Sequence, residues 1–234
     1  MNKGVIWDLD GVLADTRELH FRCWVTALAE REISLDRETF NRVFGMNNRD
    51  TLTTLLERQP EPFELETISG RKEEIFRMEA QWLVRPMPGA LTLLEELEEA
   101  GWLQAVASSA PMANIDLLLA ILGIRGRFQA ILSGEGLQAG KPDPKLFLRA
   151  AKALQLTPDR CVVVEDAPPG VEAAQKAGMS CIAVATTRSR DVLAKVMSST
   201  LVFDDLTQVK VESFSELIHD PFRSGTGKPT NLGK

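Results

Sequence analysis

The sequence predicts an α/β fold: a doubly wound, mainly parallel sheet with a helical cap domain inserted after the first strand. Three observations lead to this prediction. Short apolar runs without polar alternation recur along the chain, which is typical of strands buried on both faces of a parallel sheet. Stretches with the 3.6-residue period of helices separate these runs. Between residues 15 and 85, in contrast, one helical pattern follows another without any strand pattern.

The predicted sheet has six strands. The first is the apolar segment that starts at Val5 and ends at Asp8. The five later ones cover residues 103–108, 129–132, 161–165, 181–185 and 200–203. Helical patterns over 91–100 and 113–122 are followed by Gly101 and Gly123, each at the position of a helix C-cap. In doubly wound sheets ligands bind beyond the carboxyl ends of the strands, so we expect the functional residues there.

The chain divides into an α/β core of residues 1–14 and 88–221, a helical cap of residues 15–87 and a flexible C-terminal tail of residues 222–234. Asp15 and Thr16 are N-cap candidates for the first cap helix. Residues 86–89, Pro-Met-Pro-Gly, break the chain where it returns to the core. A helical unit on two short linkers beside the strand ends is suited to act as a lid.

Composition excludes several classes of protein. The net charge of -6, without a basic stripe, disfavours nucleic acid as a partner. No signal peptide and no membrane-spanning apolar stretch are evident, so we expect no membrane partner. Cys23, Cys161 and Cys181 are odd in number and widely spaced, and two of them lie in apolar strand-like runs, which predicts buried reduced thiols and a cytoplasmic protein. We also expect a monomer.

Asp8 and Asp10 are the most informative pair in the chain. They lie two residues apart where the first strand ends, so their side chains point to the same side if the pleat continues. Gly11 follows them and allows the backbone to bend close to a ligand. In isolation such a triplet is more often a turn than a site.

Polar residues also follow three other predicted strands or lie in adjoining loops. Ser108 and Ser109 end one strand, Glu165 and Asp166 end another, and Lys141 lies in a proline-rich loop. Taken singly, each has an ordinary structural interpretation as a cap, a turn or a surface charge.

Taken together, these segments resemble a known family. Residues 8–13 (Asp-Leu-Asp-Gly-Val-Leu), Ser108, residues 140–144 (Gly-Lys-Pro-Asp-Pro) and residues 165–166 (Glu-Asp) are similar, in order and context, to the four motifs of the haloacid dehalogenase superfamily. The resemblance covers residues 1 to about 205 and is greatest for the β-phosphoglucomutase-like branch. It implies a Rossmann-like core and a helical cap.

The resemblance also implies roles for the acids. Asp8 is the expected nucleophile, which forms an aspartyl-phosphate, and Asp10 the general acid and base. Mg²⁺ is the expected cofactor, bound by Asp8, the main-chain carbonyl of Asp10 and Asp166, with Glu165 supporting that shell.

Other residues are expected to bind the substrate. Lys141 and Ser108 are implied to neutralise and hydrogen-bond the phosphoryl oxygens, together with backbone N–H groups near Gly11 and Ser109. In the cap, the resemblance points to four substrate contacts. They are Thr16, His20, Arg49 and Lys72.

The predicted function is a Mg²⁺-dependent phosphatase for small phosphomonoesters, above all sugar phosphates. The first alternative is a β-phosphoglucomutase, in which a sugar hydroxyl rather than water receives the phosphoryl group. The second is a catalytically silent binding protein of the same fold. Asp10 argues against dehalogenation, which needs no acid at that position, and the absence of lysine from residues 15–21 argues against phosphonate hydrolysis.

Overall fold

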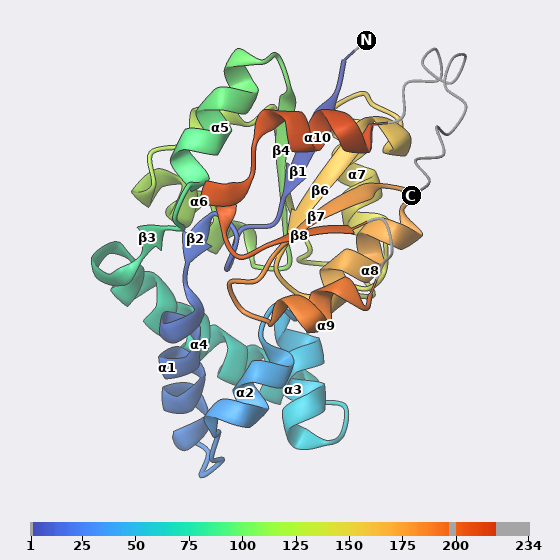
Figure 1. Ribbon diagram of the computed structural model, residues 1–234. Helices are drawn as coiled ribbons and strands as arrows, with labels where there is room; N and C mark the ends of the chain where they lie inside the picture. Colours follow the sequence, from blue (N-terminus) through green and yellow to red (C-terminus); the bar gives the residue numbers. More distant parts are fainter. Residues whose placement is uncertain (1, 197–199, 219–234) are drawn as a thin grey trace, which may run out of the picture.

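The computed structural model describes residues 2–196 and 200–218, and the predicted tail of residues 222–234 lies outside the described residues (Figure 1). Its centre is a six-stranded sheet in the order β5-β4-β1-β6-β7-β8, in which every neighbouring pair is parallel. The strands are β1 (Gly4–Trp7), β4 (Leu103–Ser108), β5 (Ala130–Ser133), β6 (Cys161–Glu165), β7 (Ser180–Val184) and β8 (Thr200–Phe203). The predicted strands and fold class are confirmed, with boundaries shifted by at most about a residue.

Both faces of the sheet are buried, which explains the continuous apolar runs. In β1, Val5 and Trp7 belong to one apolar cluster while Ile6, between them, belongs to another. The first cluster includes residues of α5 (Ala90–Glu99), α6 (Met112–Ile121) and α10 (Val211–Leu217). The second includes residues of α7 (Lys145–Ala153), α8 (Pro168–Lys176) and α9 (Arg190–Ala194). One-turn 3-10 helices cover Arg125–Arg127, Pro158–Arg160 and Leu206–Gln208.

Helix ends follow the predicted glycine signals. Gly101 and Gly123 adopt positive φ angles of 76° and 69° directly after the ends of α5 and α6. A residue with a Cβ adopts this left-handed conformation only at a cost, so glycine is the residue suited to end these helices.

Four helices form the cap: α1 (Arg17–Ala29), α2 (Arg37–Val43), α3 (Asn48–Leu56) and α4 (Pro62–Leu83). In Figure 1 they lie below the carboxyl ends of the strands. They enclose an apolar cluster of their own, which includes Trp24, Phe40 and Leu52. The cap boundaries at residues 15 and 87 remain a prediction.

The expectation that the inserted region has no strand is wrong at its two ends. Ala14–Asp15 forms β2 and Arg85–Pro86 forms β3, and the two pair antiparallel. Each strand has only two residues, which is too short to show any alternation in the sequence. The pairing ties the two linkers together beside the end of β1.

Among the described residues, the search finds no helix with both the length and the apolarity that a membrane crossing requires. All three cysteines are buried and free, as expected.

The buried thiols lead to a first prediction. Burial raises the pKa of Cys23 and of Cys161 to about 12, and the pKa of Cys181 is also well above its ordinary value. We expect the native protein to leave all three thiols unmodified by a thiol reagent at about pH 8, because neither access nor thiolate is present. Unfolding in denaturant should release three reactive thiols. Rapid labelling of the native protein would contradict the packing described.

Candidate active site

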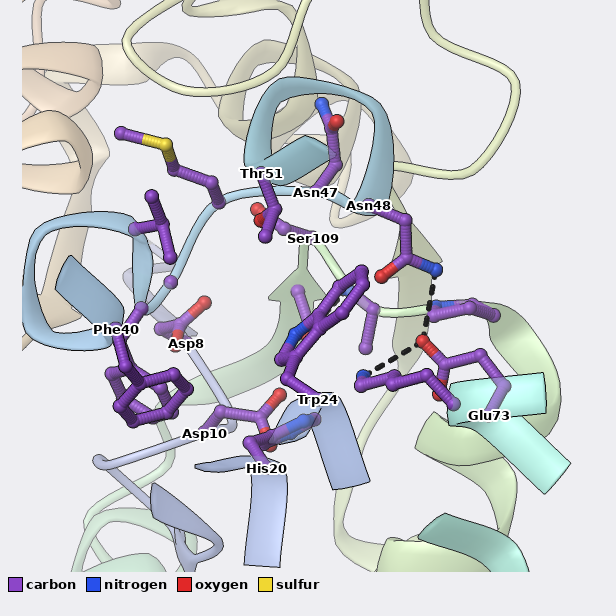
Figure 2. A pocket seen from close by; sticks show the side chains of 18 residues that line it. Asp8, Asp10, His20, Trp24, Phe40, Asn47, Asn48, Thr51, Glu73 and Ser109 are labelled. Carbon is purple, nitrogen blue, oxygen red and sulfur yellow. Dashed lines mark hydrogen bonds and ion pairs between the residues drawn. The ribbon is translucent and has the colours of Figure 1, made fainter. Parts of the chain in front are cut away.

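The two acids of the first motif lie where β1 leaves the sheet. The N–H of Asp8 still donates to the carbonyl of Val164, at 3.0 Å, so Asp8 remains in line with the sheet. Gly11 then turns the chain with a φ of 83°. A Cβ on Gly11 would lie 2.5 Å from Oδ2 of Asp166, so only glycine allows this close approach. Asp8 and Asp10 both line one cavity (Figure 2).

Core and cap both contribute to this cavity, which we call the catalytic cavity. The core provides Asp8, Asp10 and residues 108–111 after β4. The cap provides side chains from all four of its helices and their loops. They are His20, Trp24, Phe40, Val43, Phe44, Met46, Asn47, Asn48, Thr51, Lys72 and Glu73, with Gly45 adding backbone.

Lys141 joins two of the predicted acids. Its Nζ lies 2.5 Å from Oδ1 of Asp8 and 2.6 Å from Oε1 of Glu165. All three side chains are buried; that of Lys141 is 4% exposed. Burial disfavours the ammonium, but the two carboxylates outweigh it and raise the pKa of Lys141 above its ordinary range. Lys141 is therefore a permanent buried cation beside Asp8.

One lysine does not balance the negative charge of the site. Burial raises the pKa of Asp8 to about 7, Lys141 opposes the rise, and Glu165 adds to it. Burial also raises the pKa of Asp166, with Glu165 and Asp8 next in effect. Burial near other acids destabilises the ionised forms of Asp8 and Asp166, and a bound cation would stabilise them.

Glu165 is fixed by contacts on both oxygens. Oε1 accepts from Lys141, and Oε2 accepts from the N–H groups of Asp166 and Ala167 at 2.8 and 2.9 Å. A Cβ on Gly170, in the first turn of α8, would overlap this carboxylate at 1.8 Å. These contacts make Glu165 the anchor of Lys141, and its direct ligation of a metal remains a prediction.

Asp166 points back to the first motif. Its Oδ2 accepts from the hydroxyl of Thr187, and the neighbouring hydroxyl of Thr186 donates to the carbonyl of Gly11 at 2.6 Å. We did not predict either threonine from the sequence, where they follow β7 as two ordinary loop residues. They hold the Asp166 carboxylate beside the turn after β1.

The donor set fits Mg²⁺. Within residues 2–196 and 200–218 no group of three or more His, Cys, Asp or Glu side chains could hold a metal ion. The predicted set needs only two such side chains, Asp8 and Asp166, with the Asp10 carbonyl as the third protein ligand. Hard oxygen donors and remaining water ligands are typical of Mg²⁺ sites. The metal assignment is thus a proposal carried by the charge and oxygen chemistry of the site.

Asp10 is held by the cap. Its Oδ1 accepts from the hydroxyl of Thr16 at 2.6 Å and lies 3.0 Å from Nε2 of His20. Burial opposes ionisation of Asp10, but His20 and Thr16 outweigh it and lower the pKa of Asp10. Thr16 stands at the N-cap of α1, but its side chain makes no capping bond there. The predicted N-cap position of Thr16 is thus confirmed, while its hydroxyl donates to Asp10 rather than taking part in a capping bond.

Ser108 and Ser109 both line the catalytic cavity. Ser108 is 1% exposed, and its Oγ accepts from the N–H of Ala110 at 3.1 Å, which rigidifies the turn after β4. Both serines thus line the same cavity as Asp8, and their role as donors to phosphoryl oxygens remains a prediction.

Three of the four cap residues predicted to contact substrate lie at the catalytic cavity. His20 and Lys72 line it, and Thr16 is bonded to Asp10, which lines it. His20 is stacked on Phe76 with ring centroids 4.4 Å apart. Lys72 is 3% exposed and lies 2.8 Å from a carboxylate oxygen of Glu73. Arg49 is exposed and absent from this cavity. It lines a second cavity, whose wall shares Asn47, Asn48, Ser109 and Pro111 with the first.

The fold and site together define a class of protein: a capped α/β enzyme with an aspartate at the end of the first strand, a second acid two residues later, a buried lysine and a further acidic pair. A family model described as "Haloacid dehalogenase-like hydrolase" matches residues 5–184. The chain belongs to this family, and within it to the β-phosphoglucomutase-like branch.

Curated relatives carry several names. "Beta-phosphoglucomutase" of Bacillus subtilis is 34% identical over 189 residues, 78% of this chain and 83% of that protein. "Protein SUPPRESSOR OF QUENCHING 1, chloroplastic" of Arabidopsis thaliana is 32% identical over 229 residues, 95% of this chain but 21% of that protein. "5-amino-6-(5-phospho-D-ribitylamino)uracil phosphatase, chloroplastic" of the same plant is 30% identical over 217 residues, 92% of this chain and 57% of that protein.

The predicted cytoplasmic location of this chain remains a prediction.

A solved structure agrees with the fold. The structure of CbbY from Rhodobacter sphaeroides in complex with phosphate superposes with a TM-score of 0.81 at 26% identity. The match covers 92% of this chain and 100% of that one. The fold therefore extends over the cap as well as the core.

The buried ion pairs lead to a second prediction. Replacing Lys141 by Met leaves Asp8 and Glu165 uncompensated, and loss of one partner of a buried pair typically costs about 3–5 kcal/mol. We expect a loss of that order in the free energy of unfolding, measured by urea denaturation near pH 8. The double variant K141M/E165Q should recover part of it, because one uncompensated charge is removed.

Lys145→Met is the matched control. Its side chain is 58% exposed and its ammonium lies 3.9 Å from a carboxylate oxygen of Asp143, so its removal should change stability by less than about 0.5 kcal/mol. Equal stability of K141M and K145M would contradict the importance of the buried lysine.

Proposed function

We propose that this protein is a Mg²⁺-dependent phosphatase that hydrolyses small phosphomonoesters, in particular sugar phosphates, through an aspartyl-phosphate on Asp8. The observation that carries the proposal is the position of Lys141 between Asp8 and Glu165, with Asp10 and Asp166 beside them. This arrangement offers a nucleophile, a positive charge and a second acid within one cavity.

In the first step, a carboxylate oxygen of Asp8 bonds to phosphorus while the bond from phosphorus to the ester oxygen breaks. Asp10, in its protonated form, gives its proton to the departing oxygen, which leaves as an alcohol. Bound Mg²⁺ supplies neutralisation of the phosphoryl oxygens, held by Asp8, Asp166 and the Asp10 carbonyl.

In the second step, a water attacks the phosphorus of the aspartyl-phosphate and gives its proton to the now ionised Asp10. Inorganic phosphate leaves, and Asp8 returns as a carboxylate. Lys141 and the donors at Ser108 and Ser109 are suited to compensate the charge of the phosphoryl oxygens in both steps. Thr16 and His20 favour the ionised form of Asp10, which is the form that the second step needs.

The leaving group would occupy the cap side of the catalytic cavity and extend into the second cavity, where Arg49 lies. Lys72, Asn48 and Thr51 provide polar groups among the aromatic rings of Trp24 and Phe40. Such a mixture of polar and aromatic groups suits a polyhydroxylated substrate. The plant relative named as a phosphatase of a phosphoribityl compound supports this class of substrate.

A β-phosphoglucomutase activity is the second candidate, favoured by the relative of that name from Bacillus subtilis and by His20 and Lys72 at the site. The two activities differ only in the acceptor of the phosphoryl group, which is water in one and a sugar hydroxyl in the other.

The third prediction distinguishes these candidates. With Mg²⁺ and a panel of sugar phosphates, the phosphatase releases inorganic phosphate. With β-glucose 1-phosphate and catalytic 1,6-bisphosphate, the mutase yields glucose 6-phosphate without phosphate release. Asp8→Asn should lower turnover by about a thousandfold or more, because the covalent nucleophile is lost.

Asp15→Asn serves as the control for that variant, since Asp15 is an exposed acid on β2 close to the same turn and should leave turnover unchanged. Undiminished phosphate release by D8N would refute the mechanism. No turnover of any substrate by the wild-type protein would favour the catalytically silent alternative.

The fourth prediction concerns the metal. EDTA should abolish phosphate release and added Mg²⁺ should restore it. Asp166→Asn should raise the Mg²⁺ concentration needed for half-maximal rate by about tenfold or more, because one of two carboxylate ligands is lost. Asp159→Asn, an exposed acid before β6, is the control and should match the wild type. Full turnover in EDTA would refute the metal assignment.

A further inference from the structure

A buried carboxylate of the cap has no part in the proposed reaction. Glu73, on α4, is 5% exposed and lines the catalytic cavity. A buried charge is costly unless it is paired and hydrogen-bonded, so its contacts indicate what it does.

Within the cap, Glu73 holds two residues of the cavity wall. Its Oε1 accepts from Nζ of Lys72 at 2.8 Å and from Nδ2 of Asn48 at 2.9 Å, and Figure 2 shows both contacts. Lys72 lies on the same helix as Glu73, whereas Asn48 begins α3. One carboxylate oxygen therefore fixes side chains from two cap helices.

The other oxygen reaches the core. Oε2 of Glu73 accepts from Nδ2 of Asn114, at 2.5 Å, and Asn114 is a fully buried residue in the first turn of α6. Oδ1 of Asn114 in turn accepts from Nη1 of Arg77, on α4, at 3.2 Å. The bond from Arg77 orients the amide of Asn114, so that its NH₂ group must face Glu73.

We propose that Glu73 is a positioning residue: its bond to Asn114 couples closure of the cap on the core to the arrangement of the catalytic cavity. When α4 is seated on α6, the same carboxylate fixes Lys72 and Asn48. Closure also positions Asp10, the proposed general acid. Asp10 is bonded to Thr16 and His20 at the start of α1, and α1 packs against α4. Opening the cap would break the bonds that join it to the core, namely Glu73 to Asn114 and Thr16 and His20 to Asp10.

As long as position 114 is an asparagine, this role needs an acceptor oxygen at both ends of the carboxylate of residue 73. All three groups that face Glu73 are donors, namely the Lys72 ammonium and the amides of Asn48 and Asn114. A glutamine has only one acceptor oxygen, so it would turn its NH₂ group either toward Asn114 or toward Lys72 and Asn48. Either orientation sets a donor against a donor.

The double variant Glu73→Gln with Asn114→Asp restores the match. The introduced glutamine can direct its oxygen to Lys72 and Asn48 and its NH₂ group to the introduced carboxylate at position 114. That carboxylate also accepts from Arg77. The coupling between cap and core should return without a glutamate at position 73.

Two measurements test the proposal. The first is hydrogen–deuterium exchange of the ligand-free protein, which needs no activity. E73Q and N114A should increase exchange along α4 and in the first turns of α6 and α1, while E73Q/N114D returns it toward the wild-type level. Glu74→Gln is the matched control, because Glu74 is the next residue, exposed and paired with Arg71 on the surface.

The second measurement rests on the proposed function and uses the best sugar phosphate of the panel. If the fraction of molecules with a closed cap falls to about a tenth, KM should rise by about tenfold in E73Q and in N114A. In E73Q/N114D, KM should return most of the way to the wild-type value. E74Q should behave as the wild type.

The results separate this inference from the proposed function. Exchange and KM of E73Q equal to those of E74Q, or no recovery in the double variant, would overturn the role of Glu73 while leaving the phosphatase proposal intact. Absence of turnover in the wild type would refute the phosphatase proposal, and the exchange pattern would still decide on Glu73.

Discussion

The buried ammonium of Lys141 between Asp8 and Glu165 is the interaction on which the rest of the site depends. It joins the loop after β5 to the ends of β1 and β6, so it exists only because a parallel sheet brings those ends together. Without it, two carboxylates would be buried side by side with no compensation. With it, the end of the sheet still carries an excess of negative charge, which is the environment that the proposed Mg²⁺ would neutralise.

The second acid depends on the cap rather than on the sheet. Asp8 is fixed by core residues, whereas the side chain of Asp10 is bonded to Thr16 and His20 of the cap helix α1. The proposed nucleophile Asp8 and the proposed general acid Asp10, two residues apart in the sequence, are thus held by different parts of the protein. This division gives a physical reason why catalysis should require the cap to be closed, and Glu73 with Asn114 lies at the contact where closure is made.

The sequence was sufficient for features with a local signal. Strands buried on both faces give continuous apolar runs, and functional residues follow strand ends, so β1, β4 and β6 with Asp8, Ser108 and Asp166 could be predicted. The pairing of β2 with β3 could not, because two residues show no period. The partnership of Glu73 with Asn114 joins residues 41 apart and leaves no pattern in the sequence. The position of Arg49 in the second cavity depends on how α3 is oriented, which its sequence does not specify.

The central claim is that the carboxylate of Asp8, held beside Lys141, bonds to phosphorus. Acid quenching of the enzyme during turnover of a sugar phosphate, followed by peptide mass spectrometry, tests it most directly. The expected result is a single phosphoryl group on the peptide that contains Asp8, lost on standing in alkali as acyl phosphates are. Phosphorylation of another residue, or sustained turnover with none at Asp8 at any quench time, would contradict the claim.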